Sequence, residues 1–315
     1  MSKHTYRGAE RRPAAGIVLA AVLTAAIAVS LSSACATGRA DGSGGEAIAP
    51  LAPAVRPAEY GPRPLCVGHR GAAGLAPQNT MASFRAGIAA GVDAIELDIH
   101  LSSDGRLVVI HDPVVDKLTD GKGRVSAMSL AELRALDASA RFPGWTGEPQ
   151  RLPTLEEALD LLAEPGNEKV GLQLEIKLDE DGSRHPGIEA AALAAVRDRG
   201  LIDRTIVISF DFPTLATARE LEPGVKTCAL VGKAWFKAAG GSRPDQAAAI
   251  AASGADYAGV DHRYLSRELF DALRAAGLGV GAWTVDDPAV MMALSSLGVD
   301  FVTTNRPDLF AAALP

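Results

Sequence analysis

Three carboxylates lie in short segments in which apolar residues alternate with polar or charged ones. Glu96 and Asp98 lie two residues apart in one such segment, so both point to the same face of a strand. Glu175 holds a similar position in a second segment, at 170–177. Converging buried acids are costly unless a positive charge neutralises them. Oxygen ligands without cysteine suit a hard divalent cation, Ca²⁺ or Mg²⁺.

Two histidines and two cationic side chains accompany these acids. His69 and Arg70 end the first apolar run, Lys177 ends the run that holds the third acid, and His111 ends another strand-like run. A histidine pair beside a metal ion, a lysine and an arginine suits acid–base chemistry on an anionic phosphate. The residues also allow a second interpretation, in which the acids only form salt bridges with Arg70 and Lys177.

The elements that must position these side chains alternate along the chain. Eight apolar, strand-like runs are each followed by a helix-like segment, and this alternation over about 250 residues predicts an α/β fold, a (β/α)8 TIM barrel. An open doubly wound sheet is the alternative, but the first strand–helix turn lacks a G-x-G-x-x-G loop. The predicted strands are 65–71, 94–100, 170–177, 205–210, 226–231, 257–262, 279–285 and 301–305, and the clearest helices are 79–90, 154–163, 188–199, 266–276 and 288–297.

The second strand departs from this alternation. Ser103, Asp104 and Gly105 form a tight-turn signal between two strand-like runs, which predicts a hairpin. Pairing across this turn would bring His111 near Asp98. Residues 113–153 then have little strand pattern, and we expect them to form an excursion over the rim of the barrel where the strands end.

The first 64 residues are typical of an export signal and a linker. A basic stretch, an apolar stretch and small residues precede Cys35, which predicts a signal peptide over 1–34 with Cys35 as a lipidated mature N-terminus. An uncleaved anchor or a soluble secreted protein is the alternative, and all three place the domain outside the cytoplasm. Residues 35–64 are rich in Gly, Ala and Pro and predict a flexible linker, which leaves 65–315 as one barrel domain.

Charge and cysteine content exclude some functions. Thirty-one basic residues against 38 acidic ones give a net charge of −7, which argues against a nucleic-acid partner. Cys66 and Cys228 lie in apolar strand-like runs, so we expect two buried free thiols, with a disulfide as the alternative. Trp283 ends the seventh strand and lies either at the barrel mouth or in the core.

These motifs together resemble the glycerophosphodiester phosphodiesterase family. The similarity extends over about 65–310, and the order and spacing of the HRG, ExD and HD motifs are specific in combination. The matching segments are GHRG at 68–71, APQNT at 76–80, ELDIHLSSDGRLVVIHD at 96–112, LTDGKG at 118–123, SLAELRALDAS at 129–139, LPTLEEAL at 152–159, LEIK at 174–177, SF at 209–210 and WTVD at 283–286.

The resemblance implies a metal-dependent phosphodiesterase barrel that releases glycerol 3-phosphate and an alcohol. By this resemblance Glu96, Asp98 and Glu175 bind the metal, Ca²⁺ first and Mg²⁺ as the alternative, and His69 and His111 serve as general acid and base. Arg70 and Lys177 match the groups that hold the phosphate, and Trp283 matches an aromatic side chain of the substrate cleft. The implied partners are a small glycerophosphodiester and, through the lipidated Cys35, a membrane.

Two positions depart from the family pattern. Gln78 stands where the family has Glu, so its expected partner Arg70 loses a charged neighbour, and Asn305 stands where the last strand usually ends in Asp. Alternative functions are a lysophospholipid or wall-polymer phosphodiesterase with the same site, a weakened surface binding protein, or a barrel glycosidase. His185, in the loop after the third strand, is expected to be exposed to solvent, with contact to a substrate headgroup as the alternative.

Overall fold

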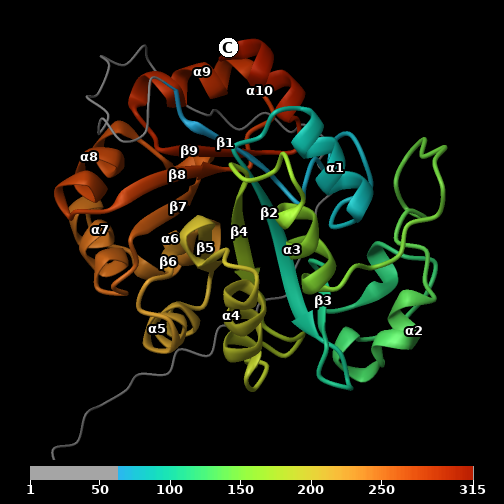
Figure 1. Cartoon of the computed structure of the whole chain (residues 1–315). Coiled ribbons are helices and arrows are strands. Elements are labelled where there is room, and N and C mark those ends of the chain that lie inside the picture. Colours follow the sequence, from blue (N-terminus) through green and yellow to red (C-terminus); the bar gives the residue numbers. More distant parts are fainter. Residues whose placement is uncertain (1–62, 315) are drawn as a thin grey trace, which may run out of the picture.

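Eight parallel strands close into a barrel in the computed structural model, which describes residues 63–314 (Figure 1). Strand β1 pairs with β2 on one side and with β9 on the other, and this double pairing closes the ring. The predicted barrel is therefore confirmed, and the open sheet is wrong. The barrel strands are β1 (Leu65–Gly68), β2 (Ala94–Leu101), β4 (Gly171–Ile176), β5 (Thr205–Ser209), β6 (Lys226–Val231), β7 (Tyr257–Asp261), β8 (Gly279–Trp283) and β9 (Phe301–Thr304).

The predicted hairpin is also present. Strand β3 (Leu107–Val109) runs antiparallel to the end of β2, with His100 opposite Val108. The N–H of Ile110 donates to the carbonyl of Asp98 at 3.0 Å, so the next residue, His111, is placed beside the acidic end of β2 as expected.

Helices surround the barrel, and most begin at a capping side chain. Thr154, for example, caps α3 and exchanges hydrogen bonds with Glu157 in a capping box. The first helix begins at Met81 rather than at Asn79, because Asn79 has a left-handed backbone (φ 56°) and Thr80 is the N-cap. The helices are α1 (Met81–Ala89), α2 (Leu130–Arg134), α3 (Leu155–Ala163), α4 (Ile188–Asp198), α5 (Phe212–Leu221), α6 (Lys233–Ala239), α7 (Arg243–Ala251), α8 (Arg267–Ala275), α9 (Pro288–Leu297) and α10 (Pro307–Ala313).

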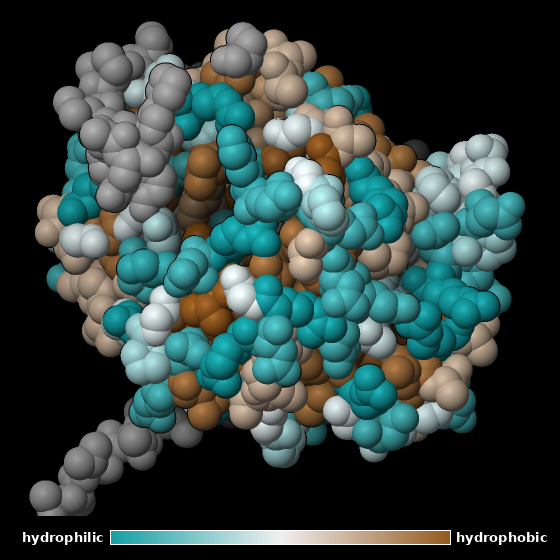
Figure 2. All heavy atoms as spheres, in the orientation of Figure 1, coloured by the Kyte–Doolittle hydropathy of each residue, from teal (hydrophilic) through white to brown (hydrophobic). Residues whose placement is uncertain are grey.

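The main apolar core lies between the strands and these helices, and a smaller cluster fills the barrel interior around Ile208, Leu230 and Phe301. Cys66 and Cys228 are both buried and free, as predicted. Burial raises the pKa of the Cys66 thiol to about 12, which keeps it protonated. Hydrophilic side chains cover much of the face shown in Figure 2.

The excursion forms a small core of its own beside β3. Short 3₁₀ helices at Val115–Lys117 and Val125–Ala127 and helix α2 pack around Val115, Val125 and Leu133. Among the described residues, none from 113–153 lines the cavity at the barrel mouth. The segment does reach the rim, where Arg124 pairs with Glu180 of the loop after β4, but it does not cover the cavity, because its apolar side chains pack on each other and on β3.

No helix within residues 63–314 is long and apolar enough to cross a membrane. The predicted signal and most of the predicted linker lie outside the described residues, so both stay predictions.

A buried ion pair stabilises the end of the barrel opposite its mouth. Asp300 is fully buried and accepts two hydrogen bonds from Arg274, at 2.7 and 2.8 Å, and one from the N–H of Val280 at 2.7 Å. Replacing Asp300 by Ala would leave the N–H of Val280 without this acceptor and the charge of Arg274 with only the main-chain carbonyls of Leu278 and Gly298. We expect Asp300→Ala to lower the free energy of unfolding by about 3 kcal/mol, measured by urea denaturation.

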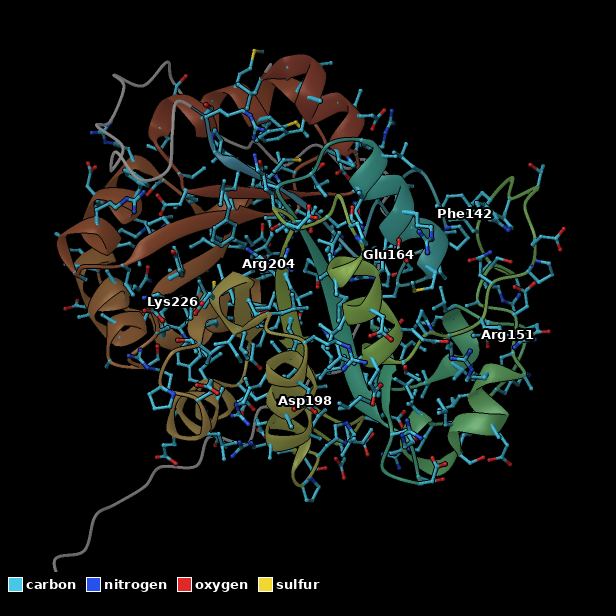
Figure 3. All side chains as sticks on the ribbon, viewed as in Figure 1. Phe142, Arg151, Glu164, Asp198, Arg204 and Lys226 are labelled. Carbon is cyan, nitrogen blue, oxygen red and sulfur yellow. The ribbon has the colours of Figure 1, made fainter. Side chains whose placement is uncertain are left out.

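The control is Arg85→Ala, which removes the exposed ion pair with Glu164 (Figure 3). Both of its side chains are about half exposed, so the loss should stay below about 1 kcal/mol. Equal losses for the two variants would show that Asp300 does not have the structural role assigned to it.

Candidate active site

The three predicted carboxylates meet at the mouth of the barrel. Glu96 and Asp98 share the inward face of β2, and the pairing of β2 with β4 puts Asp98 directly opposite Glu175. All three residues are buried, with exposures of 2, 1 and 7%. One ligand oxygen from each lies within 4.8 Å of the others. Alternation on two paired strands is thus sufficient to assemble this carboxylate cluster of Glu96, Asp98 and Glu175.

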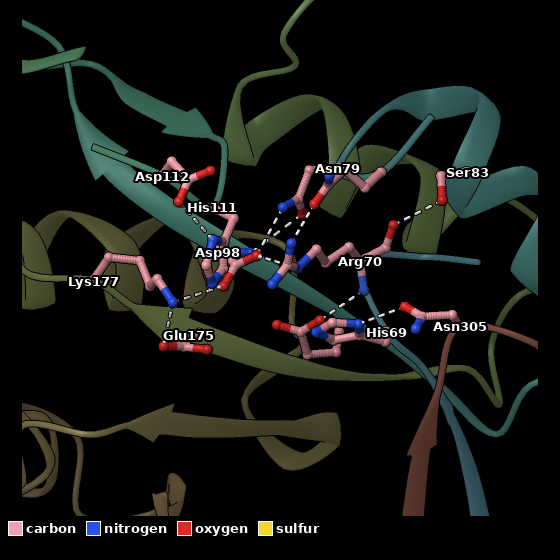
Figure 4. Close-up of polar contacts among 12 residues, drawn as sticks. His69, Arg70, Asn79, Ser83, Asp98, His111, Asp112, Glu175, Lys177 and Asn305 are labelled. Atoms are coloured by element: carbon pink, nitrogen blue, oxygen red, sulfur yellow. Dashed lines mark hydrogen bonds and ion pairs between the residues drawn. The ribbon is translucent and has the colours of Figure 1, made fainter. Parts of the chain in front are cut away.

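Two cations lie against the carboxylate cluster (Figure 4). Lys177 Nζ lies 2.6 Å from Glu175 Oε1 and 3.3 Å from Asp98 Oδ1, and Arg70 Nε lies 3.5 Å from Asp98 Oδ2. The alternative of a salt-bridge network is therefore partly correct. With all three carboxylates ionised, the two positive charges leave a net charge of −1.

The carboxylate cluster also fits a divalent cation. Asp98 Oδ1 is buried, and within residues 63–314 it accepts no hydrogen bond and has only the ion pair with Lys177. Such an atom in a native protein needs a further partner, and an all-oxygen donor set with excess negative charge is suited to Ca²⁺ or Mg²⁺. Glu96, Asp98 and Glu175 are the residues that would hold the ion.

The cluster strongly perturbs its own protonation. Burial, and then the charges of Asp98 and Glu175, raise the pKa of Glu96 well above its ordinary value. Burial also raises the pKa of Glu175, to about 7. For Asp98 the effect of burial is outweighed by Lys177, His111 and Arg70, so its pKa lies well below the ordinary value. In the absence of a metal ion, Asp98 is therefore the acid most firmly ionised.

His69 follows β1 and is oriented by a relay that crosses the closure of the barrel. Its Nδ1 lies 2.7 Å from Asn305 Oδ1, and Asn305 Nδ2 donates to Asp286 Oδ2 at 2.8 Å. A carboxylate only accepts, so the amide nitrogen of Asn305 must face Asp286 and its oxygen must face His69. His69 Nδ1 then carries the proton and Nε2 is free to accept one. Burial and the charge of Arg70 lower the pKa of His69 to about 3.

His111 has a different partner. Its Nδ1 lies 3.3 Å from Asp112 Oδ1, so a carboxylate faces the ring where His69 has a neutral amide. Burial and the charge of Lys177 lower the pKa of His111, while Asp98 and Asp112 act in the opposite direction. The two histidines therefore have unequal environments, and His111 has the better support for a positive ring.

Arg70 and Asn79 are held in left-handed backbone conformations next to the carboxylates, with φ 50° and 56°. The N–H of Arg70 donates to Glu96 Oε2 at 2.7 Å, and Asn79 Nδ2 donates to Asp98 Oδ2 at 2.7 Å. Arg70 Nη1 also donates to Gln78 Oε1, as expected for that pair. Backbone strain of this kind is often found at functional sites. Here it turns two donors toward the acids.

The cavity at the mouth has one polar and one apolar side. Trp283 lines the apolar side and is fixed by a hydrogen bond from Nε1 to the carbonyl of Gly259 at 2.8 Å. Phe210, 45% exposed, lies edge-on to it with ring centroids 5.5 Å apart. The lining includes the polar residues His69, Arg70, Glu96, His111 and Glu175 and the apolar residues Ile208, Phe210, Leu230, Trp283 and Phe301.

The structure therefore brings together the predicted carboxylates, histidines, Arg70 and Trp283, with Lys177 behind Glu175. Cys35 lies outside the described residues. Sequence reasoning missed the support given by Asn79, Asp112 and the Asn305–Asp286 relay. Only Asp112 had a local signal, because it directly follows His111.

The raised pKa of Glu96 yields a test of this electrostatic arrangement. A buried acid with a raised pKa destabilises the metal-free fold as pH rises above the ordinary value of 4.5. Glu96→Gln removes that charge but keeps an oxygen for the Arg70 N–H. We expect the variant, without metal, to melt several degrees above wild type at pH 8 and to lose this advantage near pH 4, measured by calorimetry.

Added Ca²⁺ or Mg²⁺ is the control for this variant. Because metal binding to the folded protein stabilises it, the ion should raise the Tm of wild type and leave that of Glu96→Gln nearly unchanged. A variant less stable than wild type at pH 8 without metal would contradict the assigned charge repulsion.

Known proteins resemble this chain over almost the whole barrel. The model of the glycerophosphoryl diester phosphodiesterase family matches residues 69–309. The chain is 36% identical to YhdW of Bacillus subtilis (77% of this chain, 94% of YhdW) and 32% identical to the glycerophosphodiester phosphodiesterase of the same organism (79% and 85%). An Oleispira antarctica phosphodiesterase, solved in complex with the product sn-glycerol-3-phosphate, superposes with a TM-score of 0.68 at 27% identity (81% and 98%). The chain belongs to the glycerophosphoryl diester phosphodiesterase family and is a phosphoric diester hydrolase.

Proposed function

We propose that the enzyme hydrolyses glycerophosphodiesters to sn-glycerol 3-phosphate and an alcohol, with a divalent cation on Glu96, Asp98 and Glu175. The observation that carries the proposal is the placement of two unequal histidines in one cavity with Glu96 and Glu175 of the carboxylate cluster. The product bound to the Oleispira antarctica relative supports the choice of substrate.

The cation is Ca²⁺ in this proposal, with Mg²⁺ as the alternative. The chemistry that it supplies is charge neutralisation and polarisation of a non-bridging phosphate oxygen. Arg70, which lines the cavity, and Lys177, which lies behind Glu175, add positive charge and would bind the phosphate. Their ion pairs with Asp98 hold both side chains in place before substrate arrives.

His69 is the general base and His111 the general acid in the first step. The relay through Asn305 leaves His69 Nε2 free to take the proton of the glycerol 2-hydroxyl, whose oxygen then bonds to phosphorus. Asp112 favours the protonated ring of His111, which gives its proton to the departing alcohol oxygen as the bond from that oxygen to phosphorus breaks. Water then opens the cyclic phosphate with the two roles reversed. Direct attack by water is the alternative.

The apolar side of the cavity suits the alcohol part of the substrate. Trp283 and the exposed Phe210 present ring surface to the same cavity as the charged groups. A lysophospholipid or a wall polymer with glycerol phosphate linkages would use the same groups, and a substrate panel separates these possibilities.

Substitution of the charged groups tests the function. We expect His111→Ala to lower kcat/KM on glycerophosphocholine by about 10²–10⁴-fold, because an acid–base group is lost. Lys177→Met should lower it by about 10²-fold through loss of charge at the phosphate. Chelation of metal should abolish activity, and Ca²⁺ or Mg²⁺ should restore it, with released glycerol 3-phosphate as the readout.

Lys226→Met is the matched lysine control. Lys226 begins β6 at the opposite end of the barrel from the mouth, where it pairs with Asp256 and is exposed (Figure 3). Its replacement should leave kcat/KM unchanged. Full activity of His111→Ala would refute the assigned mechanism, and binding of glycerophosphocholine by wild type without turnover would favour a surface binding protein.

We also propose that the enzyme is exported and held at a membrane by lipidation of Cys35, after removal of residues 1–34. The basic, apolar and small-residue order before Cys35 supports this proposal. The extracytoplasmic domain would then reach its substrates on the linker at 35–64.

Replacement of Cys35 tests this location. In a bacterial host we expect the wild-type protein in the membrane fraction with a lipid-modified Cys35 at its N-terminus, and Cys35→Ser without the lipid. Mass spectrometry of the N-terminal peptide distinguishes the two. An unmodified, uncleaved wild-type protein would instead support an N-terminal anchor.

A further inference from the structure

Two buried histidines that have no place in the proposed mechanism contact each other beside the site. His100, near the end of β2, is 1% exposed, and His185, in the loop between β4 and α4, is 7% exposed. The rings meet edge to face with centroids 5.3 Å apart, and His100 Nδ1 lies 3.1 Å from His185 Nε2. The expectation that His185 is exposed to solvent is therefore wrong, and His185 is not among the residues that line the cavity.

The neighbours of His100 determine where the protons of this pair lie. His100 Nε2 is 3.2 Å from the main-chain carbonyl of His111, which can only accept, so Nε2 carries the proton. A neutral ring then has an unprotonated Nδ1, and His185 Nε2 must be the donor to it. A second proton on His100 would put a positive charge in a place where the ring is only 1% exposed. The result is a chain of two hydrogen bonds, in which His185 donates to His100 and His100 donates to the carbonyl of His111.

This chain of hydrogen bonds ends at the backbone of His111, for which a general-acid role is proposed above. His111 lies beyond the last residue of β3, Val109, so it is outside the β2–β3 ladder. The N–H of Ile110 is held by the carbonyl of Asp98, and the carbonyl of His111 is held by His100. These two contacts fix the His111 main chain against the same strand that carries two of the three carboxylates.

The chain of hydrogen bonds begins at His185, and the loop that carries His185 is held by ion pairs. The loop that carries His185 also holds Asp179 and Glu180, which pair with Arg124 at 3.8 and 3.0 Å. The backbone of Arg124 in turn pairs with that of Val114, three residues after His111, in an isolated β-bridge. The loop therefore contacts the His111 segment both through the histidine pair and through Arg124.

We propose that His100 and His185 are positioning residues for His111: the pair holds the main-chain carbonyl of His111 and thereby determines where its imidazole stands relative to the carboxylate cluster. The inference rests on the acid–base role proposed above for His111. Neither ring contacts substrate in this proposal, so their effect must pass through His111.

The test compares two replacements of His185. Phe has a ring of similar size but no donor, whereas Gln can present an N–H near the place of Nε2. We expect His185→Phe to lower kcat on glycerophosphocholine by about 10- to 100-fold, because small displacements of a catalytic group are costly. KM should change little, and His185→Gln should recover most of kcat. Wild-type kcat in His185→Phe would overturn the proposal.

Combination with His111→Ala separates positioning from a general structural role. If His185 acts through His111, then His185→Phe should cause no further loss of activity in the His111→Ala background. The same fold loss in both backgrounds would overturn the inference while leaving the proposed function intact. Full activity of His111→Ala alone would refute the proposed function instead.

Nitrogen NMR of histidine-labelled wild-type protein gives a readout that does not depend on the activity of any variant. We expect both His100 and His185 as the Nε2–H tautomer, with the Nδ1 of His100 showing the shift of a hydrogen-bond acceptor. Signals are assigned by their loss in His100→Gln and His185→Gln. An Nδ1–H tautomer of His100 would overturn the proposed chain, whatever the kinetic result.

Discussion

Mutual repulsion among Glu96, Asp98 and Glu175 is the constraint around which the mouth of this barrel is built. Their ligand oxygens lie within 4.8 Å of one another in a buried place. Arg70 and Lys177 offset part of the charge, and Asn79 and the main chain of Arg70 donate to the carboxylates. The left-handed backbone of Arg70 and Asn79 is best understood as the cost of aiming these donors.

His69 and His111 also differ in the charge of the group that faces the ring. His69 faces a neutral amide whose carboxylate is one hydrogen bond further away, whereas His111 faces Asp112 directly. This difference underlies the opposite proton-transfer roles proposed for the two imidazoles. The departure at Asn305 does not leave His69 without support, because Asp286 fixes the orientation of the amide.

Local patterns in the sequence were sufficient for the barrel and for the acidic groups. Alternation in β2 and β4 defines the faces of Glu96, Asp98 and Glu175, and the turn at Gly105 brings His111 back to β2. The burial of His185 and the separate core of the excursion were not predicted, because both depend on packing between segments distant in sequence. The Asn305–His69 contact likewise spans 236 residues, and no local pattern encodes it.

Closure of the barrel has a consequence for when the enzyme can become active. β1 is among the first elements of the described chain and β9 among the last, and the hydrogen bond from His69 to Asn305 crosses the seam between them. A chain in which β9 has not yet paired with β1 therefore lacks an oriented His69 even when the carboxylate cluster on β2 and β4 has formed. The complete site would arise only after the last strand has closed the ring.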